Sequence, residues 1–196
     1  MEDALAYKQM FAWLNSNFGL SEKAWIKYQP EMSIIKAEEN FQLQHAGLPV
    51  SRFYFLLNGL VRFHYNTPDG KELNKSFYGE NNIVGSLSAL IMDEPCRFGV
   101  STLERSTLIE MPYRSKANVW ASSPEWQEVF NRCCQLMLIR NERREHELLT
   151  LSAKERFLQL IKNFPEYSTR IPQYHIASYL GITPVALSKY KKDWLK

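Results

Sequence analysis

The chain has 196 residues, of which 45% are hydrophobic and 23% charged, a composition typical of a folded globular protein. This length allows one domain of moderate size and a second, small one, each with its own hydrophobic core. No apolar run approaches the roughly 20 residues that a membrane-spanning helix needs, and the N-terminus lacks the basic start and apolar block of a secretory signal. We therefore expect a cytoplasmic protein that does not associate with membranes.

The net charge of +3 is unevenly distributed along the chain. From Lys154 onward there are eight Lys or Arg against three Asp or Glu, a net charge of +5, so residues 1–153 carry a net charge of −2. Such an asymmetry is typical of a nucleic-acid-binding module attached to a domain that does not bind nucleic acid.

The sequence contains no recognisable pattern for metal binding, disulfides or catalysis. Cys96, Cys133 and Cys134 are too few and too poorly spaced for a disulfide framework or a four-ligand metal site, and the four histidines do not cluster. Adjacent Cys133 and Cys134 lie in an apolar helical stretch, which favours burial as small hydrophobic residues over redox sensing or metal binding. There is also no Gly-rich phosphate loop or nucleophile elbow. We predict no metal, no catalytic residues and no enzyme activity.

The first thirty residues have a helical pattern. Phe11, Leu14 and Phe18 are three or four positions apart, and Ser21 reads as the start of a second helix after Gly19. We expect short helices whose aromatic residues pack on a larger body.

From residue 32 to about residue 112 the periodicity becomes that of strands. Asn58-Gly59 and Asp69-Gly70 each stand between two apolar runs, and such dipeptides are the strongest short-range signals for a β-hairpin. Several short strands with turns of this kind predict an antiparallel sandwich or barrel.

The longest helical pattern covers residues 124–150. One stripe of side chains along it is almost wholly apolar, and it consists of Trp126, Val129, Phe130, Cys133, Met137 and Arg140. Packing within one subunit and packing against a second copy explain such a stripe equally well. A strongly charged run follows, and residues 149–152 break it and are predicted to form a hinge.

A further helix is predicted directly after this hinge. Ser152 and Glu155 have the spacing of a capping box, which favours a helix that runs through Lys162 or Phe164. Pro165 would then end it. Its apolar face is expected to pack under the last segment of the chain.

Residues 171–192, IPQYHIASYLGITPVALSKYKK, read as two helices joined by a tight turn. Gly181 suits a left-handed turn, and Thr183 followed by Pro184 suits an N-cap with proline at the first helical position. The apolar residues expected to lock the helices together are Ile176, Leu180, Ile182, Leu187 and Tyr190. This order of features is the pattern of a DNA-binding helix-turn-helix, with an ordinary helical hairpin as the alternative.

The second of these helices, predicted from residue 184 to about 194, would expose one side to DNA. Residues near its start would reach base edges, and the lysines together with Thr183 would contact phosphates. The candidate DNA-binding residues are Thr183, Pro184, Val185, Ser188, Lys189, Lys191 and Lys192.

The stretch FYFLLNGLVRFHYNTPDGKELNKSFYGENNIVGSLSALI resembles the β-roll of the cyclic-nucleotide-binding domain in the Crp/Fnr family of bacterial transcription regulators. The resemblance covers nearly the whole chain, and the segment PQYHIASYLGIT is similar to Bacteroidetes-type members. It implies an α+β fold in which an antiparallel β-roll (a double-stranded β-helix), a long dimerisation helix and an all-α helix-turn-helix domain follow one another. The wing of that last domain is reduced to residues 167–172 at most. The implied divisions are 1–122 for the roll with its leading helices, 123–151 for the long helix and hinge, and 152–196 for the DNA-binding domain.

The resemblance also points to an effector pocket, whose candidate residues are Gly85, Ser86, Leu87, Arg97 and Phe98. In members that bind cyclic AMP, a Gly-Glu pair contacts the ribose, and a later Arg followed by a small residue pairs with the cyclic phosphate. Here Ser86 replaces the glutamate, and Phe98 stands where the small residue is expected. We therefore favour a structural role for Arg97, paired with Asp93 or Glu94, and expect no cyclic AMP bound in the usual way and no other cofactor.

The base-reading residues of the cyclic-AMP-binding members fall, by position, on Pro184, Val185 and Lys189. Only Lys189 keeps a positively charged donor, so the preferred operator must differ from theirs. The resemblance implies double-stranded DNA as a partner, a homodimer, and RNA polymerase as a candidate further partner.

Two functions remain open from the sequence. The first is a dimeric transcription regulator with an altered effector pocket. The second is a cyclic-nucleotide or small-anion binding module whose helix-turn-helix has become a structural or protein-interaction domain.

Overall fold

The computed structural model of the chain describes residues 2–114 and 119–194. It opens with helix α1 (Glu2–Phe18), helix α2 (Glu22–Tyr28) and a 3₁₀ turn, η1 (Gln29–Glu31). The hydroxyl of Ser21 accepts a hydrogen bond of 3.2 Å from the backbone N–H of Ala24, so the predicted start of the second helix is confirmed.

Two four-stranded antiparallel sheets follow and form the β-roll. Their strands are β1 (Ser33–Ala37), β2 (Gln42–Gln44), β3 (Arg52–Asn58), β4 (Val61–Asn66), β5 (Glu72–Tyr78), β6 (Asn82–Val84), β7 (Gly99–Thr102) and β8 (Ser106–Pro112). The strand orders are β1-β8-β3-β6 and β2-β7-β4-β5, and a short helix, α3 (Leu87–Met92), follows β6. The predicted antiparallel β-roll is therefore confirmed.

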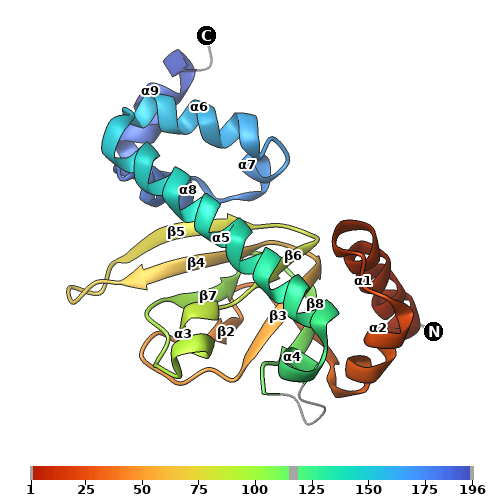
Figure 1. Cartoon of the computed structure of the whole chain (residues 1–196). Helices are drawn as coiled ribbons and strands as arrows, with labels where there is room; N and C mark the ends of the chain where they lie inside the picture. Colours follow the sequence, from red (N-terminus) through yellow and green to blue (C-terminus); the bar gives the residue numbers. More distant parts are fainter. Residues whose placement is uncertain (1, 115–118, 195–196) are drawn as a thin grey trace.

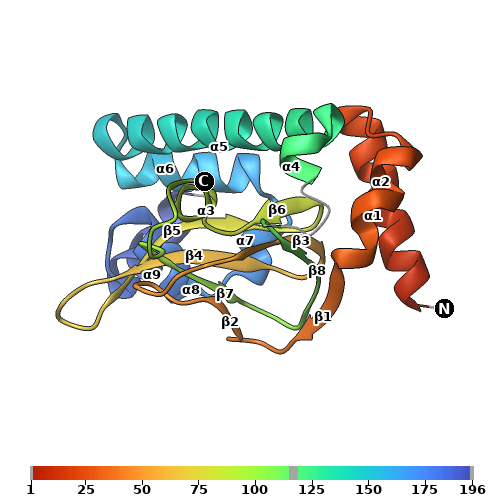
Figure 2. The same cartoon turned by 60° about the horizontal axis from the view of Figure 1, so that its bottom comes forward.

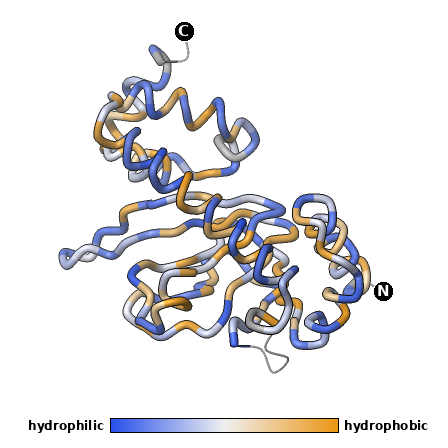
Figure 3. The backbone as a smooth tube through the Cα atoms, in the orientation of Figure 1, coloured by the Kyte–Doolittle hydropathy of each residue, from blue (hydrophilic) through white to orange (hydrophobic). Residues whose placement is uncertain are grey.

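The turn between β3 and β4 shows why glycine stands there. Gly59 has φ +112°, in the left-handed region, and a Cβ atom at this position would lie only 2.1 Å from Oγ of Ser106. The second predicted hairpin, between β4 and β5, projects away from the body, and its tip is hydrophilic (Figure 3).

After the short helix α4 (Val119–Ser122), the long helix α5 (Pro124–Thr150) has the predicted bounds. It runs diagonally from the roll to the C-terminal helices (Figure 1). The indole Nε1 of Trp126 donates a hydrogen bond of 2.9 Å to the backbone oxygen of Ala24, and its ring lies 5.0 Å from that of Tyr28. This end of α5 is therefore fixed to the N-terminal helices of the same subunit.

The apolar stripe of α5, which the sequence left open between packing within the subunit and packing against a second copy, faces inward. Trp126, Val129 and Cys133 are at most 7% exposed and belong to the core that α5 shares with α1, α2 and the roll. Phe130 and Met137 pack against the same core. The helical period was read correctly, but sequence spacing alone cannot tell a face that packs within the subunit from one that packs against a partner.

Four helices complete the chain: α6 (Ala153–Asn163), α7 (Tyr167–Arg170), α8 (Gln173–Leu180) and α9 (Pro184–Trp194). The capping box of α6 is confirmed, since Ser152 N–H donates to the carboxylate of Glu155 at 2.8 Å and Glu155 N–H donates to Oγ of Ser152 at 3.3 Å. Two connecting segments differ from prediction. The hinge expected at residues 149–152 is only two residues long, because α6 begins at Ala153 after α5 ends at Thr150, and the segment expected to hold a remnant of the wing contains the helical turn α7.

The C-terminal helices pack directly on the roll. Leu60, Phe77 and Leu103 of the roll belong to the same buried cluster as Phe157, Leu180 and other residues of α6 to α9. Helix α8 lies against β5, and α6 begins where α5 ends (Figures 1 and 2). In the described part of the chain, no helix is both long and apolar enough to cross a bilayer.

Candidate DNA-binding surface and effector pocket

Helices α8 and α9 have the geometry of a helix-turn-helix. Gly181 closes α8 in the left-handed region, with φ +70° and ψ +32°, and the hydroxyl of Thr183 caps α9 by accepting a 3.1 Å hydrogen bond from the N–H of Ala186. Leu180 and Leu187 are fully buried between the helices. Tyr190 was expected to face inward but is 42% exposed, so this part of the prediction was wrong.

The predicted DNA-binding residues lie mostly on the surface. Thr183, Pro184, Val185, Ser188 and Lys189 are exposed, and Val185 is 79% exposed although it is apolar. An exposed apolar side chain of this kind is chemically suited to contact the methyl group of thymine in a major groove.

The last two predicted DNA-binding residues are Lys191 and Lys192. Lys191 is half-buried, and its Nζ donates to the side-chain oxygen of Gln173 on α8 at 3.3 Å, so it ties the two helices together at their ends. The side chain of Lys192 lies outside the described residues. The candidate surface is therefore centred on the first two turns of α9.

Arg97, the cationic candidate of the effector pocket, lies on the surface of the β-roll. Its side chain is 82% exposed, and its Nη2 lies 3.2 Å from the carboxylate of Glu94. The expected structural pairing is confirmed. An exposed pair of this kind adds little stability because solvent screens it.

Phe98 occupies the interior of the roll instead. It is 7% exposed, its ring stacks on that of Phe63 at 5.0 Å, and the ring of Tyr65 lies 6.1 Å away. The ammonium of Lys75 lies over the outer side of the ring, 5.5 Å from its centroid. The large side chain thus fills space that a small residue would leave open.

The remaining pocket candidates, Gly85, Ser86 and Leu87, make close contacts within the roll. Gly85 has φ +139°, and a Cβ atom there would meet Cβ of Phe53 at 3.1 Å. The N–H of Ser86 donates to the side-chain oxygen of Gln44 at 2.9 Å, and Leu87 is 4% exposed in the core. Gly85, Ser86 and Leu87 thus serve the packing of the roll, whereas the Arg97 side chain is exposed to solvent.

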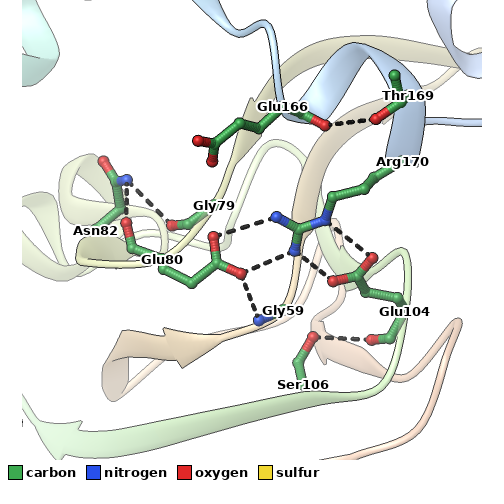
Figure 4. A network of polar contacts seen from close by, with 9 residues as sticks. All are labelled: Gly59, Gly79, Glu80, Asn82, Glu104, Ser106, Glu166, Thr169 and Arg170. Carbon is green, nitrogen blue, oxygen red and sulfur yellow. Dashed lines mark hydrogen bonds and ion pairs between the residues drawn. The ribbon is translucent and has the colours of Figure 1, made fainter.

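A cluster that sequence reasoning missed joins the C-terminal helices to the roll (Figure 4). Arg170 of α7 donates to both oxygens of Glu80, at 2.8 and 3.3 Å, and also to the carboxylate of Glu104. Glu80 in turn accepts from the N–H of Gly59 at 3.1 Å. Burial alone would raise the pKa of Glu80, but the hydrogen bonds from Arg170 and Gly59 hold it below its usual value. These partners are far apart in sequence, so no local sequence pattern predicts that they meet.

We expect Arg170→Met to lower the free energy of unfolding by about 2 kcal/mol, because it leaves two half-buried carboxylates facing each other without their shared cation. Urea denaturation measures this change. Arg105→Met is the matched control, since its ion pair with Glu38 is 3.5 Å long and more than 70% exposed on both sides. It should change stability by less than about 0.5 kcal/mol. Equal effects of the two substitutions would contradict the role assigned to Arg170.

A second polar cluster connects β5 to α8. The side-chain amide of Asn74 donates to the backbone oxygen of His175 at 3.1 Å and lies 3.0 Å from its Nδ1, while the N–H of Asn74 donates to Oγ of Ser178 at 3.0 Å. Beneath them Arg62 holds the carboxylate of Glu72 at 2.6 Å. Burial, followed by the charge of Arg62, lowers the pKa of His175 to about 4. The ring is therefore neutral near pH 7.

Comparison with known proteins agrees with this architecture. Residues 35–123 match the family model of the cyclic nucleotide-binding domain. Among curated protein sequences, none matches the chain significantly. The matches to solved structures extend over most of the chain.

One similar structure is the c-di-GMP responsive global regulator CLP from Xanthomonas campestris. It is 16% identical, the alignment covers 88% of this chain and 93% of that one, and the TM-score is 0.71. A CooA mutant from Carboxydothermus hydrogenoformans is 14% identical with coverages of 91% and 82% and a TM-score of 0.70. A transcriptional regulator of the CRP/FNR family from Thermus thermophilus is 16% identical with coverages of 83% and 86% and a TM-score of 0.67.

These matches confirm the predicted fold class, from the β-roll to the C-terminal helices. The narrower similarity to Bacteroidetes-type members stays a prediction. Residues 35–123 match the cyclic nucleotide-binding domain, and the chain as a whole is similar in fold to the Thermus thermophilus regulator of the CRP/FNR family and to CLP.

Proposed function

We propose that this protein is a dimeric, DNA-binding transcription regulator whose β-roll does not bind cyclic AMP in the usual way. The observation that carries the proposal is the helix-turn-helix itself. Its inner residues are buried, its turn glycine and N-cap are in place, and the first two turns of α9 present Val185, Ser188 and Lys189 to solvent. The similarity in fold to known regulators supports the same function, with contact to RNA polymerase as a further expectation.

The roll supports the second half of the proposal. A cyclic phosphate would need a cation directed into a pocket shielded from water, where a charge-assisted hydrogen bond is strongest. Arg97 is turned to solvent and paired with Glu94, and Phe98 fills the interior next to it. The residues that hold cyclic AMP in the best-known members are thus either replaced or differently placed here.

The dimer contact that we propose uses the outer face of α5. Leu136, Leu138 and Ile139 are each more than 50% exposed in the middle of the helix. Burying such side chains against a second copy would stabilise a dimer through the hydrophobic effect. We retain the division at residues 122 and 151 as part of the proposal, with α5 as the dimer helix between the roll and the DNA-binding domain.

Ile139→Glu should weaken the dimer at least roughly tenfold, because it places an unpaired carboxylate in an apolar contact. Sedimentation velocity over a concentration series measures the change. Ile26→Glu on α2 is the control, since Ile26 is similarly exposed (59%, against 54% for Ile139) but belongs to a different helix. A wild-type monomer at high concentration, or an unchanged dimer in Ile139→Glu, would refute this contact.

Binding to duplex DNA tests the regulator function itself. The small number of lysines on α9 predicts modest affinity for one helix-turn-helix, so tight binding needs a dimer on two half-sites. Lys189→Ala should weaken binding several-fold and reduce the slope of log K against log salt by about 1. Fluorescence anisotropy at several salt concentrations measures both.

Lys8→Ala is the charge-matched control, because Lys8 is an exposed lysine on α1, outside the C-terminal domain. It should bind DNA as the wild type does. If the wild-type protein shows no salt-dependent binding, the helix-turn-helix is instead a structural or interaction domain. Its partner would then be the roll, on which it packs through a shared apolar cluster and through the hydrogen bonds of Asn74.

A further inference from the structure

A small cavity lies where β5, α5, α6 and α8 meet, and its volume is about 50 Å³. Such a volume has room for about three water-sized groups. Among the described residues, its lining carries four cationic side chains, Lys75, Arg140, Arg143 and Arg144, against one acidic side chain, Glu147. Arg143 is exposed to solvent, so Lys75, Arg140 and Arg144 leave a surplus of two positive charges over Glu147 around a partly buried space. Such a surplus is unfavourable unless something compensates it.

Two polar atoms in this lining are buried without a hydrogen-bond partner in the described part of the chain. One is Oγ of Ser76, whose residue is only 8% exposed, and the other is Nη1 of Arg144. The nearest carboxylate oxygen to that Nη1, on Glu147, is 3.7 Å away, too far for a hydrogen bond. A buried donor without a partner destabilises the fold by about 1–3 kcal/mol.

The cations are held in these positions by other contacts. Arg144 donates through Nη2 to the backbone oxygen of Tyr179, and its guanidinium lies 3.6 Å from the centroid of that ring, so it is not free to turn toward Glu147. Lys75 donates to the side-chain oxygen of Asn141 at 2.9 Å, and an ammonium has three donors. Burial, together with the charges of Arg140 and Arg144, lowers the pKa of Lys75. A bound anion would offset the repulsion between these cations and would accept hydrogen bonds from the buried donors.

We propose that this cavity binds the phosphate group of a small phosphorylated molecule, held by Lys75, Ser76 and Arg144. Phosphate oxygens accept several hydrogen bonds at once, which suits an ammonium, a hydroxyl and a guanidinium that converge on one space. A larger hollow of about 320 Å³ shares Arg140 and Phe164 with the cavity and offers room for the organic part of such a ligand. The site is separate from the solvent-facing Arg97.

The cavity is lined from both sides of the junction between α5 and α6, by residues of the roll, of α5 and of the C-terminal helices. A ligand there would hold the C-terminal helices against the roll, and would therefore be the effector of the regulator proposed above. Calling this ligand an effector rests on the proposed regulator function. The binding of the ligand does not rest on it, because the binding can be measured without DNA.

Isothermal titration calorimetry on the full chain tests the site, with inorganic phosphate and adenosine monophosphate as probes and sodium chloride at equal ionic strength as the reference. Ser76→Ala should weaken phosphate binding roughly tenfold, as expected for loss of one hydrogen bond to a charged group. Lys75→Met should weaken it by at least as much. Lys8→Met removes the same charge from the surface of α1 and should leave binding unchanged.

Ser76→Ala is the sharpest variant, because its hydroxyl makes no hydrogen bond to the described residues and its loss should leave the thermal stability of the unliganded protein unchanged or higher. Tighter binding of adenosine monophosphate than of phosphate would support occupation of the larger hollow as well. Binding of phosphate alone would support the oxyanion site without it. The site is refuted if the wild type binds neither probe above the chloride reference, or if Ser76→Ala and Lys75→Met bind as the wild type does. DNA binding measured separately shows whether the regulator function stands in either case.

Discussion

Phe98→Ala should lower the free energy of unfolding by about 3–5 kcal/mol, the usual range for a large aromatic side chain removed from a packed core. The ring of Phe98 is 7% exposed and stacks on Phe63 inside the roll, so its removal leaves a cavity that the surrounding strands cannot easily close. Denaturation in urea measures the loss. The substitution should not create cyclic AMP binding, because Arg97 remains directed to solvent.

Phe41→Ala provides the control for this experiment. Phe41 is 51% exposed, so its truncation should reduce stability by less than about 1 kcal/mol. If Phe98→Ala reduced the free energy of unfolding as little as Phe41→Ala does, the ring of Phe98 would not fill the roll. Binding of cyclic AMP by Phe98→Ala would show that Arg97 can turn inward, against the arrangement described above.

Lowering the pH from 7 to 5 should destabilise the protein by about 2 kcal/mol through His175. Its pKa in the folded state is about 4, below the ordinary value of 6.5, so the unfolded chain takes up a proton in this window and the folded chain does not. The stability that His175 contributes is complete above pH 6.5 and is lost as the pH falls toward 4. Burial and the charge of Arg62 also lower the pKa of His64, which adds to the effect in the same direction.

The acidic group in this cluster is Glu72. Burial alone would raise its pKa, but the hydrogen bond and charge of Arg62 hold the pKa below its usual value. Urea denaturation at a series of pH values measures the slope, and His175→Gln should flatten it between pH 7 and 5. His146→Gln is the control, since His146 is exposed on α5 and should leave the slope unchanged. An equally steep slope in His175→Gln would assign the pH dependence to other groups.

The elements that depend on local sequence were predicted well. The bounds of α5, the capping box at Ser152 and the turn glycine Gly181 each follow from signals within a few residues, and the structure has all three. The β-roll followed from hairpin dipeptides and from the resemblance to a known family. A structural role for Arg97, near Asp93 and Glu94, was expected because these acids lie close to it in the sequence, and the pair forms with Glu94.

Features that depend on the meeting of distant segments were not predicted. Arg170 meets Glu80 and Glu104 only after the C-terminal helices have docked on the roll, and no spacing in the sequence links them. From the sequence the inward stripe of α5 could be assigned neither to the core of the subunit nor to a dimer, because helical periodicity identifies a face without identifying what covers it. Tyr190 is exposed because α9 presents only part of its apolar surface to α8, and this depends on how the two helices cross.

The proposed regulator function is tested most directly by selecting bound duplexes from a random DNA pool with the wild-type protein at moderate salt. A dimer with one helix-turn-helix in each subunit should enrich sequences with two inverted half-sites whose centres are about 10 base pairs, or a multiple of this, apart. The half-sites should differ from those of the cyclic-AMP-binding members, because Pro184 and Val185 stand where those members carry charged base-reading residues. A pool that stays random after repeated rounds, with no salt-dependent retention, would contradict the account.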